Sequence, residues 1–351
     1  MATSRRQFFR ALFLLGVVVL NFGAFGWTEA RGRGDALAGL SVHPRALKSE
    51  SNPDAESFPI MVVCTTAMVA EMVREVGGVW VEVTQLMGEG TDPHLYKATA
   101  SDVKAIDASD IVFTNGLMLE GRMQDVLQRF RERGRRVVAI GDAVPHDKLR
   151  HPPGFHGEAD PHIWMDPALW GLGTELVRDT LTAHGPSQAD EFNRRAVAYG
   201  KKVNAVAAEV AALMNRIPPS RRLLVTAHDA FGYFGRAYGI EVAGVQGVST
   251  DSESGLADLR RLVDRLVAAE VPAVFAESSV ADKGVRALIE GAEARGHRVR
   301  LGGMLYSDAM GKPGTPDGTY PGMLLHNARV ISEALAPASA AAPVPGAPDA
   351  G

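Results

Sequence analysis

Short apolar runs alternate with segments of helical length between residues 58 and 336. The predicted strands cover residues 60–65, 81–87, 111–116, 137–141, 223–228, 241–246, 273–278 and 298–303. The predicted helices lie near residues 67–77, 99–107, 119–133, 229–238, 255–270 and 282–295, and a further helix is predicted to start near Pro167. Such alternation indicates an α/β fold with parallel sheets covered by helices on both faces. The gap after the fourth strand divides the chain into two similar α/β lobes, residues 58–186 and 218–336.

A single long helix is predicted between these lobes, over residues 187–217. Its apolar residues alternate spacings of four and three and form one narrow stripe: Phe192, Ala196, Tyr199, Val203, Val206, Val210, Leu213 and Ile217. Ser187 is a plausible N-cap, and the Pro218–Pro219 pair ends the helix. Some 30 residues at about 1.5 Å each make a rod on the order of 45 Å, long enough to span both lobes. A coiled-coil seam between two copies is the alternative, but the stripe lasts only about four heptads.

The two ends of the chain lie outside this pattern. Residues 1–30 combine a basic start, the apolar run of residues 11–27 and a small residue, which is typical of a secretory signal peptide. The Arg5–Arg6 pair also resembles a twin-arginine signal, and an uncleaved membrane anchor is the alternative. We expect a poorly ordered leader over residues 31–57 and a disordered Ala/Pro-rich tail over residues 337–351.

Composition and charge narrow the class of protein. The 351 residues are 46% hydrophobic and 22% charged, which is ordinary for a soluble globular protein. A net charge of −4 gives no reason to expect a nucleic acid or an anionic membrane as partner. The single cysteine, Cys64, excludes an internal disulfide and lies too far along the chain to carry an N-terminal lipid. We therefore expect a soluble periplasmic protein in which Cys64 is a small buried residue.

One short motif occurs twice, as TDPHLYKAT at residues 91–99 and as ADPHIWMDP at residues 159–167. Proline restrains its own backbone and keeps the preceding Asp extended, so each copy predicts a stiff turn that directs one imidazole. The histidines concerned are His94 and His162. A stiff loop that presents a histidine suggests metal binding or catalysis, whereas the alternative is two unrelated loop histidines.

Four residues fall at or just after predicted strand ends, where open parallel sheets bind ligands: His94, His162, His228 and Asp308. Three imidazoles and one carboxylate suit a borderline divalent ion such as Zn²⁺, with Mn²⁺ or Fe²⁺ as alternatives. Four protein ligands would close a tetrahedral site and leave no position for a substrate. Taken alone, His228 could be a hydrogen-bonded histidine at a strand end, and Asp308 could be an N-cap. Glu277 also ends a strand and could be a ligand, a partner of a ligand or a hydrogen-bonded buried carboxylate.

Five ordered motifs over residues 58–336 resemble the metal-binding receptors of ABC-type zinc and manganese importers, in their TroA-like subset: TDPHLYKATASDV, ADPHIWMDP, TAHDAFGYFGRAYGIEVAGVQGVST, FAESS and LYSDAMG. The resemblance implies two α/β lobes joined by one long helix, with the metal between the lobes. By motif, the family's ligands fall on His94, His162, His228 and Asp308. Receptors with Glu at the third position lean toward manganese, whereas this chain has His228.

A second family feature is weak in this chain. Dedicated zinc receptors often carry a long His-rich acidic loop, and the corresponding residues 145–160 hold only three spaced histidines, His146, His151 and His156. We expect these three to be solvated loop residues. Zinc and manganese therefore both remain open as the ion.

The resemblance makes a periplasmic solute-binding protein the leading hypothesis. Such a receptor, expected to be a monomer, would deliver its ion to a membrane permease powered by a separate ATPase. A secreted zinc metallohydrolase is one alternative, with Glu277 as general base if Asp308 were not a ligand. The chain lacks both a His-Glu-x-x-His pair and a Gly-x-Ser-x-Gly elbow, which disfavours that reading. An adhesin or scaffold with a structural metal is the other alternative.

Overall fold

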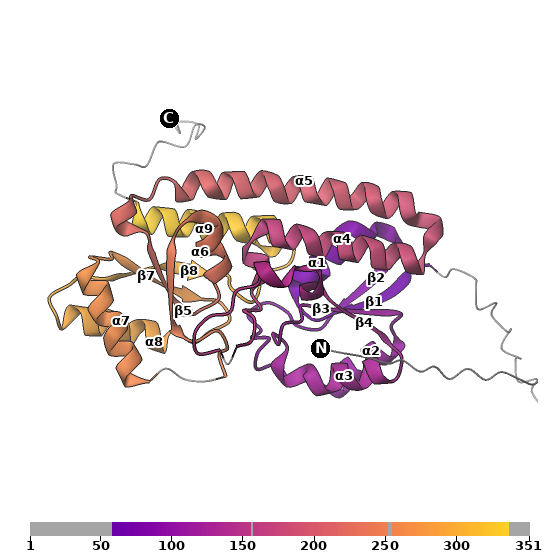
Figure 1. The fold of residues 1–351 in the computed structure, drawn as a ribbon, viewed down its shortest axis with the longest axis horizontal. Coiled ribbons are helices and arrows are strands. Elements are labelled where there is room, and N and C mark those ends of the chain that lie inside the picture. Colours follow the sequence, from indigo (N-terminus) through magenta and orange to yellow (C-terminus); the bar gives the residue numbers. More distant parts are fainter. Residues whose placement is uncertain (1–57, 156, 252–254, 337–351) are drawn as a thin grey trace, which may run out of the picture. The chain divides into compact units, whose positions relative to one another are not determined.

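The computed structural model describes residues 58–155, 157–251 and 255–336, which lie within one compact unit of residues 54–351 (Figure 1). The predicted signal peptide, leader and tail lie outside the described residues, as does His156. Within the described part of the chain, no helix combines the length and the apolar character needed to cross a bilayer.

The N-terminal lobe contains a four-stranded parallel sheet in the order β2-β1-β3-β4. Its strands are β1 (Ile60–Cys64), β2 (Val81–Gln85), β3 (Ile111–Thr114) and β4 (Arg136–Ala139). Its helices are α1 (Ala67–Gly77), α2 (Ala100–Ala108), α3 (Gln124–Glu132) and α4 (Pro167–His184). The central strands are buried on both faces, with Phe113 of β3 in one apolar cluster and Val112 in the other. A strand covered on both sides needs apolar residues at every position, which explains the uninterrupted runs in the sequence.

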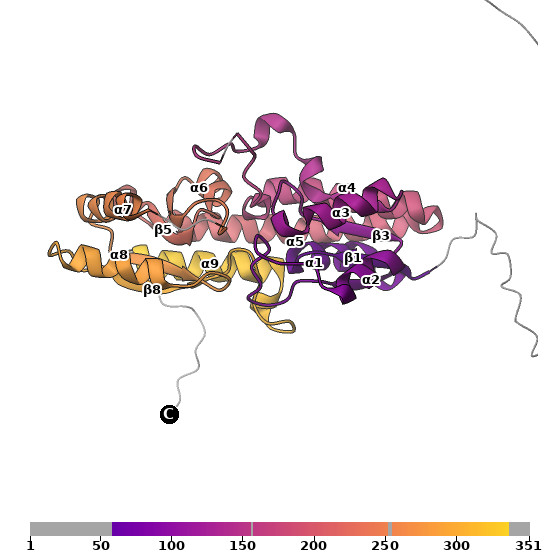
Figure 2. The same ribbon diagram turned by 90° about the horizontal axis from the view of Figure 1, so that it is seen from below.

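The C-terminal lobe repeats this alternation with two pairs of parallel strands, β5 with β6 and β7 with β8 (Figure 1). Its strands are β5 (Leu223–His228), β6 (Glu241–Gln246), β7 (Ala273–Glu277) and β8 (Arg300–Leu305). Its helices are α6 (Gly232–Tyr238), α7 (Leu256–Ala268), α8 (Lys283–Glu293) and α9 (Tyr320–Leu335). The predicted α/β fold of two lobes with parallel sheets is confirmed, and the second view of the ribbon shows the lobes along one rod (Figure 2).

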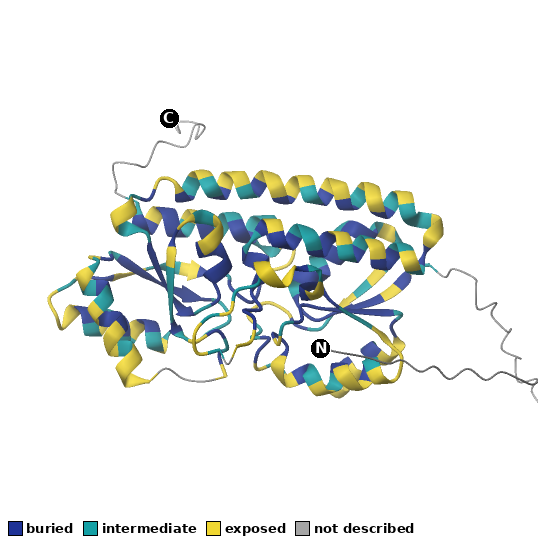
Figure 3. Ribbon diagram, viewed as in Figure 1, coloured by how far each residue is buried: buried dark blue, intermediate teal, exposed yellow. Residues whose placement is uncertain are grey.

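The rod is α5 (Ala189–Met214), a helix of 26 residues that packs on α1 and α4 of one lobe and on α9 of the other. At about 1.5 Å per residue it is about 39 Å long. Its buried residues form the predicted stripe, which Figure 3 shows on the side facing the lobes. The predicted cap is wrong: Ser187 lies in a short 3-10 turn, and the N-cap is Gln188, which makes no side-chain capping bond. Near the other end, Met214 is buried where the stripe predicted Leu213.

The helix predicted near residues 119–133 begins later, at Gln124, because a buried turn precedes it. Glu120 is fully buried, and its carboxylate accepts hydrogen bonds from the Asn115 and Gly116 amides at 2.7 and 3.1 Å. Leu117 and Met118 lie in the left-handed region, with φ of 51° and 64°. Residues in that region cannot continue a right-handed helix. The turn ends β3, and its Asn115 side chain also donates to the Pro161 carbonyl at 2.9 Å.

Cys64 is a fully buried free thiol at the end of β1. Burial raises the pKa of this thiol well above its ordinary value, although the Arg74 charge opposes the shift. A thiol with a raised pKa and no access to solvent is inert. The residue therefore acts as a small apolar side chain in the sheet, as predicted.

Candidate metal site

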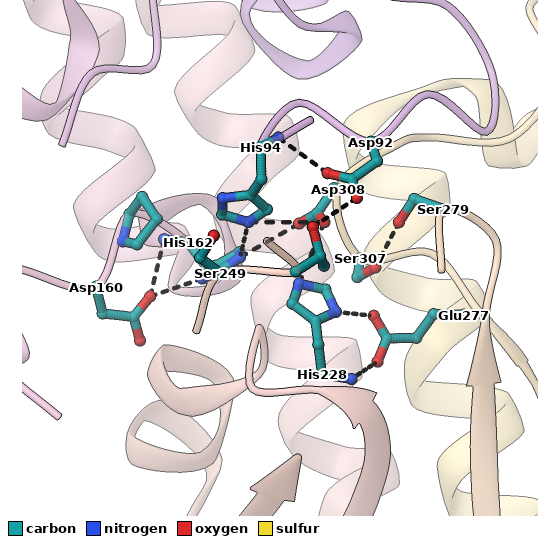
Figure 4. Close-up of polar contacts among 12 residues, drawn as sticks. Asp92, His94, Asp160, His162, His228, Ser249, Glu277, Ser279, Ser307 and Asp308 are labelled. Atoms are coloured by element: carbon teal, nitrogen blue, oxygen red, sulfur yellow. Dashed lines mark hydrogen bonds and ion pairs between the residues drawn. The ribbon is translucent and has the colours of Figure 1, made fainter. Parts of the chain in front are cut away.

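Four side chains from loops and strand ends of both lobes converge at one buried point (Figure 4). His94 lies between β2 and α2, and His162 precedes α4 in the N-terminal lobe. His228 is the last residue of β5, and Asp308 follows β8 in the C-terminal lobe. Each offers a ligand atom within 4.8 Å of the others, and none is more than 4% exposed. The structure therefore brings together all four residues that the sequence singled out.

The spacing of these atoms matches the size of a transition-metal ion. His94 Nε2 lies 3.4 Å from His162 Nε2. The Asp308 carboxylate lies 3.3 Å from His162 Nε2, 3.1 Å from His228 Nε2 and 4.0 Å from His94 Nε2. Metal–ligand bonds of about 2.0–2.1 Å in a tetrahedron place the ligands about 3.3–3.4 Å apart. The separations of 3.1–4.0 Å lie around this value, so the four groups are close enough together to hold one such ion.

Several of these polar atoms have no hydrogen-bond partner within the described residues. They are His228 Nε2 and both carboxylate oxygens of Asp308, all fully buried, whose ion-pair contacts with one another and with His162 lack hydrogen-bond geometry. A buried polar atom left without a partner costs about 1–3 kcal/mol, and more when it carries charge. A cation at the centre would satisfy all three atoms at once. The donor set, three imidazoles and one carboxylate, is one that such ions prefer.

The repeated Asp-Pro-His motif forms the same turn in both copies. Asp92 Oδ1 accepts a hydrogen bond from the His94 amide at 2.9 Å, and Asp160 Oδ1 accepts one from the His162 amide at 3.0 Å. An aspartate that binds the amide two residues on forms an Asx turn, and the intervening proline has no N–H to compete. The motif therefore fixes the backbone of each histidine and directs its ring toward the site.

Two of the histidines are also held through the other nitrogen of the ring. Asp160 Oδ1 lies 2.7 Å from His162 Nδ1, and Glu277 Oε2 lies 2.5 Å from His228 Nδ1 (Figure 4). The second oxygen of Glu277 accepts the His228 amide at 2.8 Å. A carboxylate that takes the Nδ1–H leaves the Nε2 lone pair for a metal and raises the basicity of the ring. Of the three roles open to Glu277, its contacts match those of a carboxylate that holds His228 in place.

The electrostatics of the site differ from one histidine to the next. Burial lowers the pKa of His94 to about 3, against the opposing charge of Asp308. For His162, burial is outweighed by the hydrogen bond to Asp160 and by the nearby charges of Asp160 and Asp308, which raise the pKa to about 9. The pKa of His228 is raised well above its ordinary value because Glu277 and Asp308 outweigh burial. Burial would raise the pKa of Asp308, but the His228 and His162 charges hold it well below its usual range.

Sequence reasoning missed the residues that hold Asp160, the hydrogen-bond partner of His162. Arg150 Nη1 lies 2.5 Å from Asp160 Oδ2, and the Tyr233 hydroxyl donates to the Asp160 carbonyl at 2.9 Å. The Arg150 guanidinium occupies the space beside Gly232, where a Cβ would lie 1.1 Å from its Nη1. The only signal in the sequence was the Asp in each Asp-Pro-His motif. Arg150 and Tyr233 carried none, because they meet Asp160 only in the folded protein.

Of the three loop histidines, the two that the structure describes, His146 and His151, do not join the cluster. His146 and His151 are exposed, with ring centroids 5.2 Å apart. His151 Nδ1 lies 3.0 Å from the Gly157 carbonyl oxygen, and His156 lies outside the described residues. For His146 and His151, the prediction of solvated loop residues agrees with their exposure.

Known proteins resemble this chain over most of its length. The family described as "Zinc-uptake complex component A periplasmic" matches residues 62–334. The manganese-binding lipoprotein MntA of Bacillus subtilis is 44% identical over 276 residues, which cover 79% of this chain and 90% of that protein. The zinc-binding protein TroA of Treponema pallidum is 43% identical over 276 residues, which cover 79% of this chain and 89% of that protein.

Solved structures show the same likeness in three dimensions. The periplasmic zinc binding protein TroA from Treponema pallidum superposes with a TM-score of 0.77 at 43% identity, covering 80% of this chain and 100% of that chain. Two α/β lobes on one long helix, with a buried cluster of nitrogen and oxygen ligands where the lobes meet, define a class of receptor that binds its solute between lobes. The chain belongs to the family of periplasmic zinc-uptake complex A components.

Proposed function

We propose that this protein is the solute-binding receptor of an ABC-type importer for a divalent transition metal. It captures Zn²⁺ or Mn²⁺ with His94, His162, His228 and Asp308, and delivers the ion to a membrane permease driven by a separate ATPase. The observation that carries the proposal is the convergence of four buried ligand atoms, two from each lobe, within 4.8 Å. An ion bound across two lobes links its own release to their separation.

The geometry suits both candidate ions. The relatives named above are described as binding manganese and zinc, and the YfeA protein of Yersinia pestis, 27% identical over 284 residues, is described as iron-binding. One Asp308 oxygen with three imidazoles makes the tetrahedral set that Zn²⁺ prefers. Both Asp308 oxygens face the histidines, which offers a fifth donor to Mn²⁺, an ion of higher coordination number. Fe²⁺ fits the same set.

The geometry of the site and the descriptions of the relatives argue against the two alternative functions, a zinc hydrolase and an adhesin or scaffold. A zinc hydrolase needs an open coordination position and a free general base. Glu277 is 2% exposed, and its oxygens accept hydrogen bonds from the amide and the ring of His228, so it is not free to take a proton from water. None of the relatives named above is described as a hydrolase or an adhesin.

Export follows from the same family membership. Relatives are described as lipoproteins or as periplasmic. For this chain we propose export through a signal in residues 1–30 and a periplasmic location without a lipid anchor on Cys64, which is buried in β1. We further propose that it acts as a monomer and binds no nucleic acid, in keeping with a net charge of −4.

Native mass spectrometry of the full chain tests the metal site. Protein stripped by chelator is offered Zn²⁺ and Mn²⁺ together at equal buffered free concentrations. We expect one equivalent of metal in the wild type and its loss in His94→Ala and His228→Ala. His151→Ala, the same change at an exposed histidine, is the matched control and should keep the metal.

The same experiment can overturn the assignment. Full occupancy in both site variants would mean that the ion binds elsewhere. Absence of stoichiometric metal in the wild type would refute the receptor function itself. The ion retained in competition identifies the cargo.

A further inference from the structure

The two carboxylate oxygens of Asp92 accept hydrogen bonds from groups in different lobes. Oδ1 accepts the His94 amide at 2.9 Å within the N-terminal lobe (Figure 4). Oδ2 accepts the Thr250 hydroxyl at 2.6 Å, and Thr250 follows β6 of the C-terminal lobe. In the other Asp-Pro-His turn, the corresponding second oxygen of Asp160 pairs with Arg150 of its own lobe. A single carboxylate thus joins the turn that carries His94 to the opposite lobe.

The segment next to Thr250 makes a second contact between the lobes. Asp251 forms an ion pair with Arg122, which follows the buried turn at Glu120. Both side chains are exposed, at 59% and 41%, so this pair contributes little by itself. Thr250 is only 9% exposed, and its hydroxyl meets a charged acceptor, which makes its bond the stronger of the two.

Close to the site, the lobes also meet through the fully buried side chains of Trp164 and Tyr320. Trp164 of the N-terminal lobe donates its indole N–H to the Ser307 carbonyl at 2.9 Å. The Tyr320 hydroxyl of the C-terminal lobe donates to the Trp164 carbonyl at 2.7 Å. Water cannot replace these bonds without a loss of apolar packing around Trp164 and Tyr320, both 0% exposed. The half-buried Asp92 and the exposed Arg122 pair lie where water can take the place of the partner.

His94 is the least restrained of the three histidines. His162 and His228 are each held through ring Nδ1 by a carboxylate, at 2.7 and 2.5 Å. For His94 the carboxylate of its own turn holds only the backbone amide. His94 Nε2 also has the longest approach to Asp308, 4.0 Å. If the lobes separated at Asp92, His94 would therefore be the first of the three histidines to move away from Asp308.

We propose that the Thr250–Asp92 hydrogen bond is a latch that holds the lobes closed on the His94 side and sets how long the metal stays bound. The proposal rests on the proposed function, since it concerns release of the same ion. Among the described residues no hydrogen bond joins the Thr250 side chain to a ligand side chain, so Thr250 is a positioning residue that acts through Asp92. Loss of its hydroxyl shortens the residence time of the ion and leaves the ligand set intact.

Dissociation kinetics of the Zn²⁺-loaded full chain test the latch. Excess chelator captures the released ion, and an indicator dye reports the rate in stopped flow. Thr250→Val keeps the branched shape and removes the donor, and we expect dissociation about tenfold faster, as loss of a hydrogen bond to a charged group implies. The association rate should change by less than about twofold, because the ligands stay in place. Thr250→Ser restores the hydroxyl and should return dissociation to the wild-type rate.

Two further variants separate the latch from a general loss of structure. Thr315→Val makes the same chemical change at an exposed turn, where the hydroxyl bonds to the Lys312 carbonyl of its own loop at 2.6 Å, and should leave the rate unchanged. In an Asp92→Ala background, Thr250→Val should add nothing, because the hydroxyl has already lost its acceptor. If Thr250→Val does not fold, Asp251→Asn tests the same segment and should speed release by about twofold.

The outcomes distinguish the latch from the receptor function. A wild type that holds no stoichiometric Zn²⁺ refutes the proposed function. A wild type that holds Zn²⁺ while Thr250→Val releases it at the wild-type rate refutes the latch alone. Equal changes in the association and dissociation rates, or a further loss in the Asp92→Ala background, also overturn the latch.

Discussion

Glu277 offers the sharpest test of how the protein tunes its metal ligands. The carboxylate accepts the His228 ring Nδ1–H at 2.5 Å and the His228 amide at 2.8 Å. Glu277→Gln keeps the shape of the side chain and replaces one acceptor oxygen by an NH₂ donor. If that donor faces the amide, a buried donor loses its partner. If it faces Nδ1, the ring proton must move to Nε2, the atom that points at the metal.

Either arrangement weakens metal binding, and the size of the effect can be estimated. Loss of a carboxylate behind a ligating histidine reduces metal affinity about 10–100-fold. That factor corresponds to about 1.4–2.7 kcal/mol. The range agrees with the penalty of about 1–3 kcal/mol for one buried donor left without a partner. We therefore expect the affinity for Zn²⁺ to fall about 10–100-fold while one equivalent still binds.

Competition with a chelating dye at fixed pH measures this affinity. Glu293→Gln, the same change at an exposed position of α8, is the control and should match the wild type. Unchanged affinity in Glu277→Gln would refute the role given to Glu277. Complete loss of binding with an intact fold would instead make Glu277 a ligand.

Three further predictions follow from the same geometry. Metal binding should release about two protons near pH 7, because the raised pKa values of His162 and His228 keep both rings protonated until a metal displaces the protons. Affinity for metal should therefore rise with pH at least as far as about 9, the pKa of His162. Calorimetry in buffers of different ionisation enthalpy would count the protons, and a count of zero contradicts the assignment. Gly232→Ala should displace the Arg150 guanidinium from Asp160 and lower the free energy of unfolding by about 1–3 kcal/mol, and Arg150→Gln should lower it equally. Fully additive losses in the double variant would show that the two residues act separately. Phe192→Ala should lower the free energy of unfolding by about 3–5 kcal/mol in denaturant titrations, since this ring is fully buried under α5, and a loss below about 1 kcal/mol would contradict that packing.

Local pattern was enough to predict most of the secondary structure. All eight predicted strands are present, and the end of β5 at His228 falls where the apolar run ends. A strand buried on both faces must be apolar throughout, and a helix on a core must carry a stripe, so both patterns are local consequences of burial. Helix α9 was missed because the prediction followed the alternation of strands and helices, and no predicted strand comes after this segment. The late start of α3 depends on Glu120, whose carboxylate bonds to residues outside its own segment.

In the candidate site, too, some residues could be predicted from local sequence and others only from the folded structure. The Asp-Pro-His repeat is local, since an Asx turn involves only three consecutive residues, and it was therefore visible in the sequence. Asp308 alone was as consistent with a helix cap, and Glu277 had three open roles. Their roles depend on which atoms lie within about 4 Å of them in the folded chain, and those atoms belong to residues 80 and 49 positions away.

The sequence by itself determined the elements and the two stiff turns, because those depend on neighbours along the chain. Only the tertiary structure decided which carboxylate faces the three histidines, which one supports a histidine and which one contacts the opposite lobe. The physical reason is that the three carboxylates, Asp308, Glu277 and Asp92, are the same chemical group. Each takes its role from the donors that the two lobes bring to it.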